Sequence, residues 1–80
     1  MKYIKGEKVV LSKLGKTTYP DQGTNREDVE YGVLQENFSG NYTWANVHWY
    51  NKYDACVSPP YVYKKEHLES YEKQYIYEIY

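Results

Sequence analysis

The chain has 80 residues and a net charge of −1, which suits one small domain over residues 1–80. This charge argues against a general nucleic-acid binder, which is usually clearly basic, and a DNA mimic would need many more carboxylates. Twelve tyrosines stand against one phenylalanine and two tryptophans. Because tyrosine is apolar along its ring and polar at its tip, this composition indicates a contact surface and therefore a binding module.

The first third of the chain predicts a strand followed by a long loop. Lys8–Leu14 reads as a strand, with Val9 and Leu11 on one face. Ser12–Asp28 is polar and interrupted by two glycines and a proline, which predicts a loop. Long loops in small domains often carry function.

A hairpin is expected in the middle of the chain. Glu30–Phe38 reads as a strand with Tyr31 and Val33 on one face. The turn residues Ser39–Asn41 follow, and a further strand is predicted over Tyr42–Asn51.

The last third predicts a short strand over Tyr61–Lys64 and a helical turn over Lys65–Lys73, with Leu68 buried beneath it. The β-branched and aromatic residues of Gln74–Tyr80 favour a final strand that closes the sheet. A C-terminal helix over Lys65–Tyr80 is the competing interpretation.

Five short strands with one long early loop predict a mostly β fold, a small and strongly bent five-stranded barrel. Several short motifs resemble the strands of the SH3-like superfold, which includes KOW-type, Tudor-type and true SH3 domains. The first resembles the Gly-x-x-Val-x-Leu opening of that superfold, and together they are Lys5–Leu11, Gly32–Leu34, Val47–Trp49, Tyr61–Tyr63 and Leu68. True SH3 domains usually open with Ala-Leu-Tyr-Asp-Tyr and carry a Trp pair, and neither is present here. The resemblance therefore implies the barrel and not the binding of proline-rich peptides.

Alternation along Tyr42–Asn51 separates a core face from a candidate partner-binding face. The core face comprises Ala45, Val47 and Trp49. The opposite face comprises Trp44, Asn46, His48 and Tyr50. Exposed aromatic anchors often dominate the binding energy of an interface. In the alternative interpretation, Trp44 and Tyr50 cover an end of the barrel or pack under the long loop.

Tyr19 lies in the long loop, which borders the recognition groove in Tudor-like and SH3-like barrels. By this resemblance Tyr19, Tyr50 and Tyr53 would build an aromatic cage for a methylated lysine or another cation. The competing interpretation is that Tyr19 simply packs on the barrel.

The charge is uneven along the chain, because residues 1–18 hold five lysines and one glutamate. An edge of these lysines would bind nucleic acid together with stacking aromatic side chains. They are Lys2, Lys5, Lys8, Lys13 and Lys16. The acidic remainder, in which Arg26 is the sole arginine, would repel phosphate, so nucleic acid is the less favoured partner.

No pattern indicates catalysis, a metal site or a cofactor. The spacing of His48, Asp54, Cys56 and His67 matches no zinc motif, and one Cys with two His occurs in many small domains by chance. The single Cys56 excludes an internal disulfide framework and fits a reducing compartment. The N-terminus lacks an apolar signal segment and no run reaches membrane-spanning length, so we expect a cytoplasmic protein with no membrane partner.

These observations predict a non-enzymatic module that binds another protein. The size and the composition, rich in Lys, Asn, Tyr and Glu, resemble the small proteins with which bacteriophages block host proteins, defence systems among them. That resemblance implies occlusion of a host protein by an aromatic and acidic surface. Homodimerisation through exposed tyrosines is a related expectation. The alternative is a KOW-like or Tudor-like module that binds nucleic acid or a modified peptide.

Overall fold

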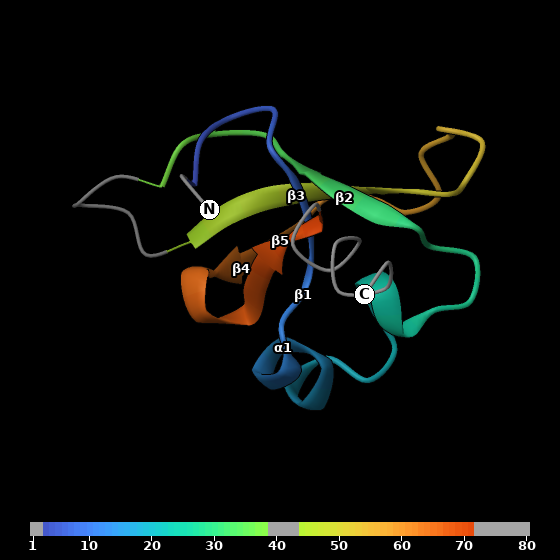
Figure 1. Ribbon diagram of the computed structural model, residues 1–80, viewed down its shortest axis with the longest axis horizontal. Coiled ribbons are helices and arrows are strands. Elements are labelled where there is room, and N and C mark those ends of the chain that lie inside the picture. Colours follow the sequence, from blue (N-terminus) through green and yellow to red (C-terminus); the bar gives the residue numbers. More distant parts are fainter. Residues whose placement is uncertain (1–2, 39–43, 72–80) are drawn as a thin grey trace, which may run out of the picture.

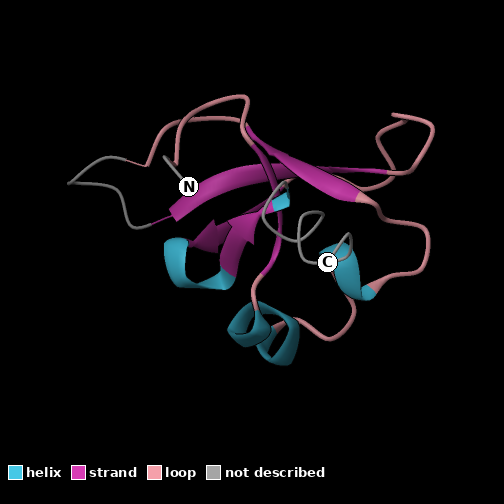
Figure 2. Ribbon diagram, in the orientation of Figure 1, coloured by secondary structure: helices cyan, strands magenta, loops and turns pink. Residues whose placement is uncertain are grey.

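A computed structural model describes residues 3–38 and 44–71, which form one five-stranded antiparallel sheet (Figures 1 and 2). The strands lie in the order β4-β3-β2-β1-β5. Their bounds are β1 Lys8–Leu11, β2 Tyr31–Leu34, β3 Trp44–Tyr50, β4 Tyr61–Lys64 and β5 Leu68–Ser70. One α-helix and two 3₁₀ turns accompany the sheet, namely α1 Lys13–Thr18, η1 Gly23–Asn25 and η2 Lys65–His67. Within the described ranges no helix is long and apolar enough to cross a membrane.

The predicted long loop over Ser12–Asp28 is in fact partly helical, because it contains α1 and η1. Ser12 begins α1 as its N-cap, and its Oγ accepts a hydrogen bond of 3.1 Å from the Gly15 amide. A serine cap satisfies an amide that the first turn would otherwise leave without a partner. The helix also shortens the first strand, which ends at Leu11 and not at the predicted Leu14.

The end of the described chain also differs from the prediction. The helical turn expected over Lys65–Lys73 is interrupted by a strand: η2 covers only Lys65–His67, Leu68 already has an extended backbone with φ −125° and ψ 150°, and the backbone is helical again at Tyr71. β5 then pairs with β1, with Leu68 opposite Leu11. Pairing with β1 outweighs the local preference for a turn. The helix considered over Lys65–Tyr80 is therefore wrong for residues 68–70, which form β5. The strand predicted over Gln74–Tyr80 lies outside the described residues.

The mostly β fold with five antiparallel strands is confirmed, and β4 has the predicted bounds. The sheet is nevertheless open and not closed into the expected barrel. β4 and β5 form its two edges, and η2 connects them along the chain. A five-stranded antiparallel sheet whose first strand pairs with both β2 and β5 is compatible with an SH3-like fold.

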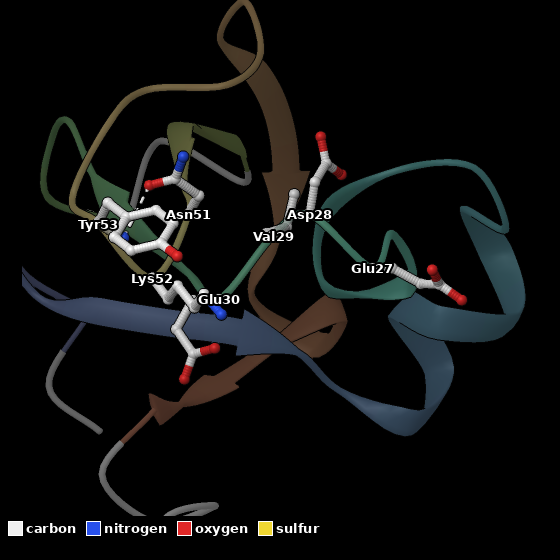
Figure 3. Close-up of a pocket in the computed structure, with 7 residues that line it drawn as sticks. All are labelled: Glu27, Asp28, Val29, Glu30, Asn51, Lys52 and Tyr53. Carbon is white, nitrogen blue, oxygen red and sulfur yellow. Dashed lines mark hydrogen bonds between the residues drawn. The ribbon is translucent and has the colours of Figure 1, made fainter.

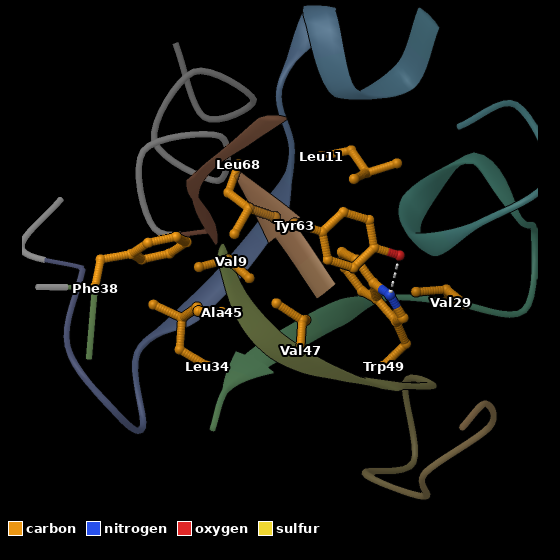
Figure 4. Close-up of a cluster of buried hydrophobic side chains, with 10 residues drawn as sticks. All are labelled: Val9, Leu11, Val29, Leu34, Phe38, Ala45, Val47, Trp49, Tyr63 and Leu68. Carbon is orange, nitrogen blue, oxygen red and sulfur yellow. Dashed lines mark hydrogen bonds between the residues drawn. The ribbon is translucent and has the colours of Figure 1, made fainter. Parts of the chain in front are cut away.

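The hydrophobic core lies on one face of the sheet (Figure 4). The predicted core faces are confirmed, because Val9, Leu11, Ala45, Val47 and Trp49 are all fully buried. The remaining members of the core cluster are Val29, Leu34, Phe38, Tyr63 and Leu68. Tyr31 and Val33 share one face of β2, as predicted, but that face is the outer one, and the β2 residues that face the core are Gly32 and Leu34.

Trp49 organises this core through two linked hydrogen bonds, the first of them buried. Its Nε1 donates to the Tyr63 hydroxyl at 3.0 Å, and that hydroxyl donates to Gln22 Oε1 at 2.7 Å. Burial raises the pKa of Tyr63 to about 12, so the hydroxyl keeps its proton and remains a donor. These two hydrogen bonds therefore join β3, β4 and the segment before η1.

Two glycines make room for the Trp49 indole. A Cβ on Gly32 would lie 2.8 Å from Trp49 Cε3, and one on Gly23 would lie 2.7 Å from Trp49 Cζ2. Both distances are too short for real carbon atoms. Gly23 also has φ +55°, a conformation that other residues rarely adopt. β2 and η1 can therefore approach the ring only because glycine occupies these two positions.

We predict that Tyr63→Phe lowers the free energy of unfolding by about 1–3 kcal/mol, because Trp49 Nε1 and Gln22 lose their buried partner. Urea unfolding followed by tryptophan fluorescence would measure it. Tyr53→Phe is the matched control, because Tyr53 is 77% exposed, and it should change stability little. Equal stability of Tyr63→Phe and the wild type would contradict the structural role of these hydrogen bonds.

Candidate functional site

The outer face of the sheet, opposite the core, is the candidate site. The register places Lys8 opposite Val33 and Val33 opposite His48, so these side chains form a row across three strands. The four residues that the alternation predicted for a partner-binding face all lie here, and they are Trp44, Asn46, His48 and Tyr50. The other outer-face residues of β2 and β4 are Tyr31, Val62 and Lys64.

One end of the outer face is apolar and exposed. Trp44 is 44% exposed, and it lies opposite Lys64, whose Nζ is 5.1 Å from the centre of the indole. Val62, which is 50% exposed, lies opposite Asn46. Two hydrogen bonds to Glu36 Oε1, from the Asn46 backbone amide at 2.8 Å and from Nδ2 at 3.1 Å, fix that asparagine. This end is therefore an aromatic surface with a lysine beside the indole and an asparagine that hydrogen bonds fix in place.

The other end of the outer face is a tyrosine stack. Tyr31 and Tyr50 stack with ring centres 5.5 Å apart and planes within 13°. Tyr71 tilts against Tyr31 at 5.7 Å, and Lys8 Nζ lies 4.5 Å from the Tyr31 ring centre. Sequence reasoning missed Tyr31, Tyr71 and Lys8 as parts of this surface, although pairing of the two predicted central strands would have placed Tyr31 beside Tyr50. One face of the Tyr50 ring is thus stacked on Tyr31 within the protein.

Asp54 ties the tyrosine stack to the turn after β3. The Tyr31 hydroxyl donates to Asp54 Oδ1 at 2.6 Å. This bond, together with burial and the negative charge of Asp54, raises the pKa of Tyr31 to about 12. Asn51 Oδ1 holds the same turn by accepting from the amides of Tyr53 at 2.9 Å and Ala55 at 3.0 Å. Asp54 itself has φ 64°, an unusual value that this bonding maintains.

An open pocket of about 230 Å³ lies beside that turn (Figure 3). Its walls come from the segment before β2 and from the turn after β3, and they comprise Glu27, Asp28, Val29, Glu30, Asn51, Lys52 and Tyr53. Asp28 is paired with Arg26 at 2.7 Å, and the Glu27 side chain points away from the other labelled residues. Lys52 Nζ lies 5.3 Å from the Tyr53 ring centre. Three of the lining residues carry a carboxylate and one is a lysine, so we call this lining the acidic rim. It lies next to the tyrosine stack.

The structure does not assemble the aromatic cage considered from the sequence. Tyr19 lies on the core side of the sheet, where its ring meets Tyr63 edge-on at 5.0 Å. Its hydroxyl lies 3.0 Å from His67 Nδ1. Burial and, after it, the charge of Glu66 raise the pKa of Tyr19. Tyr50 lies on the opposite face, so the sheet itself separates the two rings, and Tyr19 packs on the core.

The N-terminal lysines do not gather on a single edge. Lys2 lies outside the described residues. Lys5 precedes β1, and its amide bonds Asn37, whereas Lys13 and Lys16 belong to α1 beyond the other end of β1. Lys8 projects from the outer face over Tyr31. The positive charge is therefore distributed along the whole length of β1.

The four residues weighed as metal ligands or catalytic groups are likewise dispersed. His67 contacts Tyr19 on the core side, His48 lies on the outer face, and Asp54 bonds Tyr31. Cys56 is exposed, and its Sγ lies 3.4 Å from the Ser58 carbonyl. Across residues 3–38 and 44–71, no three His, Cys, Asp or Glu side chains gather as a metal ion would require.

Comparison of the chain with protein-family models, with curated proteins and with solved structures gave no match.

We predict that Asp54→Asn lowers the pKa of Tyr31 from about 12 toward its ordinary value of 10.0, because the charged acceptor is lost. Asparagine tolerates the positive φ of this position. The folded protein holds the Tyr31 proton more tightly than the unfolded chain does. The associated stability is therefore fully present below pH 10 and is lost as the pH rises toward 12.

The ¹³Cζ NMR shift of Tyr31 against pH would measure this change. Tyr63 serves as the internal control, because its pKa of about 12 arises mainly from burial and should not move. An unchanged Tyr31 titration would show that Asp54 does not control the hydroxyl.

Proposed function

We propose that this protein is a non-enzymatic binding module that occludes a surface of another protein with the outer face of its sheet. The observation that carries the proposal is the exposure of Trp44 and Val62 on neighbouring strands, while the core on the opposite face is already filled. Partly exposed tryptophan is a frequent anchor of protein interfaces. The indole is held by Lys64, so little conformational freedom is lost on binding.

The charge distribution supports a directional contact. Lys64 lies beside Trp44, whereas the pocket next to the other end of the outer face is lined by three carboxylates and one lysine, with Lys8 over Tyr31 nearby. A surplus of carboxylates at one end only would orient a partner during encounter. Occlusion of a partner requires no catalytic group.

The proposed partner is a host protein. A sheet compatible with an SH3-like fold, the small size and the composition rich in Lys, Tyr and Glu resemble bacteriophage inhibitors of host or defence proteins. Such an inhibitor would act in the cytoplasm of the host cell. We propose this role on the strength of that resemblance and of the exposed aromatic surface.

A tagged pulldown from bacterial lysate, with and without nuclease and at low and moderate salt, tests the proposal. A discrete protein that survives both treatments is the expected result. Nucleic acid recovered only at low salt would contradict it and favour the KOW-like alternative, with the lysines of residues 1–18 as the sites to mutate. Recovery of the untagged chain itself would instead indicate a homodimer.

We predict that Trp44→Ala reduces capture of the partner about tenfold or more, as expected when an anchor residue worth about 2 kcal/mol is truncated. Leu14→Ala is the matched control, because Leu14 is 51% exposed but lies on α1 and outside the outer face. Both variants should melt close to the wild type. Equal losses for the two variants would contradict a specific role of Trp44.

A further inference from the structure

β4 is an edge strand, and its free side is the feature from which we infer a mode of binding. The direction of its backbone groups follows from the sheet. The Gln35 amide donates to the Asn46 carbonyl at 2.9 Å, so the backbone of Asn46 faces β2. The Val57 amide donates to the Trp49 carbonyl at 3.0 Å, so the odd-numbered residues of β3 face the other way, toward β4.

This pattern decides which groups of β4 remain free. Opposite residues in an antiparallel pair alternate between bonded and non-bonded pairs. Val47 with Tyr61 and Ala45 with Tyr63 are therefore the bonded pairs. The amide and carbonyl of Val62 and the amide of Lys64 point away from β3. The Lys64 carbonyl is not counted among the free groups, because Lys64 is the N-cap of η2 and the carbonyl of an N-cap accepts the first hydrogen bond of its helix. Within the described chain none of these three groups has a backbone partner in a turn, loop or cap.

The flanking residues restrict what can occupy the edge. Pro59 and Pro60 precede β4, and Pro60 has no amide hydrogen, so the free side is short. Proline and lysine are common means of preventing open-ended pairing between sheets. The free side of β4 thus accepts one short strand.

The charge indicates the chemistry of that strand. Lys64 shares the outer face with Val62 and Trp44, and Lys65 follows it. The Glu66 carboxylate lies near Tyr19 on the core side of the sheet, where it contributes to the raised pKa of that tyrosine. β4 contains no carboxylate, so a second copy paired along this edge would leave Lys64 without a counter-charge. An acidic residue on a different protein supplies one.

We propose that the free edge of β4 binds an extended segment of the partner as an additional antiparallel strand, with an acidic side chain opposite Lys64. Val62 forms the bonded pair with that strand, and the Lys64 amide adds a third hydrogen bond. The partner's next outward side chain packs against Val62 and Trp44. This inference rests on the proposed function, because it specifies how the binding module meets its partner.

NMR titration of the ¹⁵N-labelled protein with a short, acetylated peptide of alternating valine and glutamate tests the proposal. The expected result is a shift of the Val62 and Lys64 amides and their protection from hydrogen exchange. The same peptide with lysine in place of glutamate should bind at least about threefold more weakly at low salt. No shift at millimolar peptide would overturn the proposal, as would protection of these amides that depends on protein concentration without peptide.

Val62→Pro is the decisive variant, because it removes an edge amide without removing a bond to β3. It should weaken peptide binding about tenfold or more, whereas Val62→Ala, which keeps the amide, should weaken it less than about threefold. A thermal melt close to that of the wild type confirms that the proline variant is folded. If Trp44→Ala abolishes capture of the partner but Val62→Pro has no effect on peptide binding, the proposed function stands and strand addition is wrong.

Discussion

The hydrogen bonds that run from Trp49 through Tyr63 to Gln22 are the constraint on which the rest of the structure depends. They connect the longest strand, an edge strand and the segment between α1 and η1. The indole fits only because Gly23 and Gly32 leave space for it. Because all three polar groups lie in or against the core, each needs its partner, and the edge strand β4 is held firmly enough to carry an exposed surface on its other side.

The tyrosines divide into groups with different physical roles. Tyr63 and Tyr19 belong to the core side, where their hydroxyls are paired. Tyr31 and Tyr50 stack on the outer face and are tied to the turn after β3. Tyr53 remains largely exposed. A high tyrosine content therefore reflects, in part, a small core that uses hydroxyl groups to join distant segments, and not a contact surface alone.

The outer face combines an exposed aromatic end, a packed tyrosine end and an acidic rim beside the latter. Trp44 and Val62 are available because each remains about half exposed, whereas Tyr50 already has a ring partner in Tyr31. In the proposed binding mode, residues near β4 should therefore contribute most of the binding free energy. In the proposed binding mode, the acidic rim at the other end of the outer face would contribute orientation more than contact area.

Local pattern in the sequence determined the β class, the alternation along β3 and the bounds of β4, since strand periodicity and turn residues are encoded in neighbouring positions. It also separated Trp44 from the core correctly. Only the tertiary structure decided that Tyr19 lies on the core side, that Tyr31 and Tyr71 flank Tyr50, and that residues 68–70 form β5. Each of these depends on pairing between segments far apart in the chain, such as Leu11 with Leu68. The Ser12 cap that begins α1 was a local signal, but Gly15 within the first turn concealed it, because glycine is a poor helix former whose small size is required here by close contact with His67.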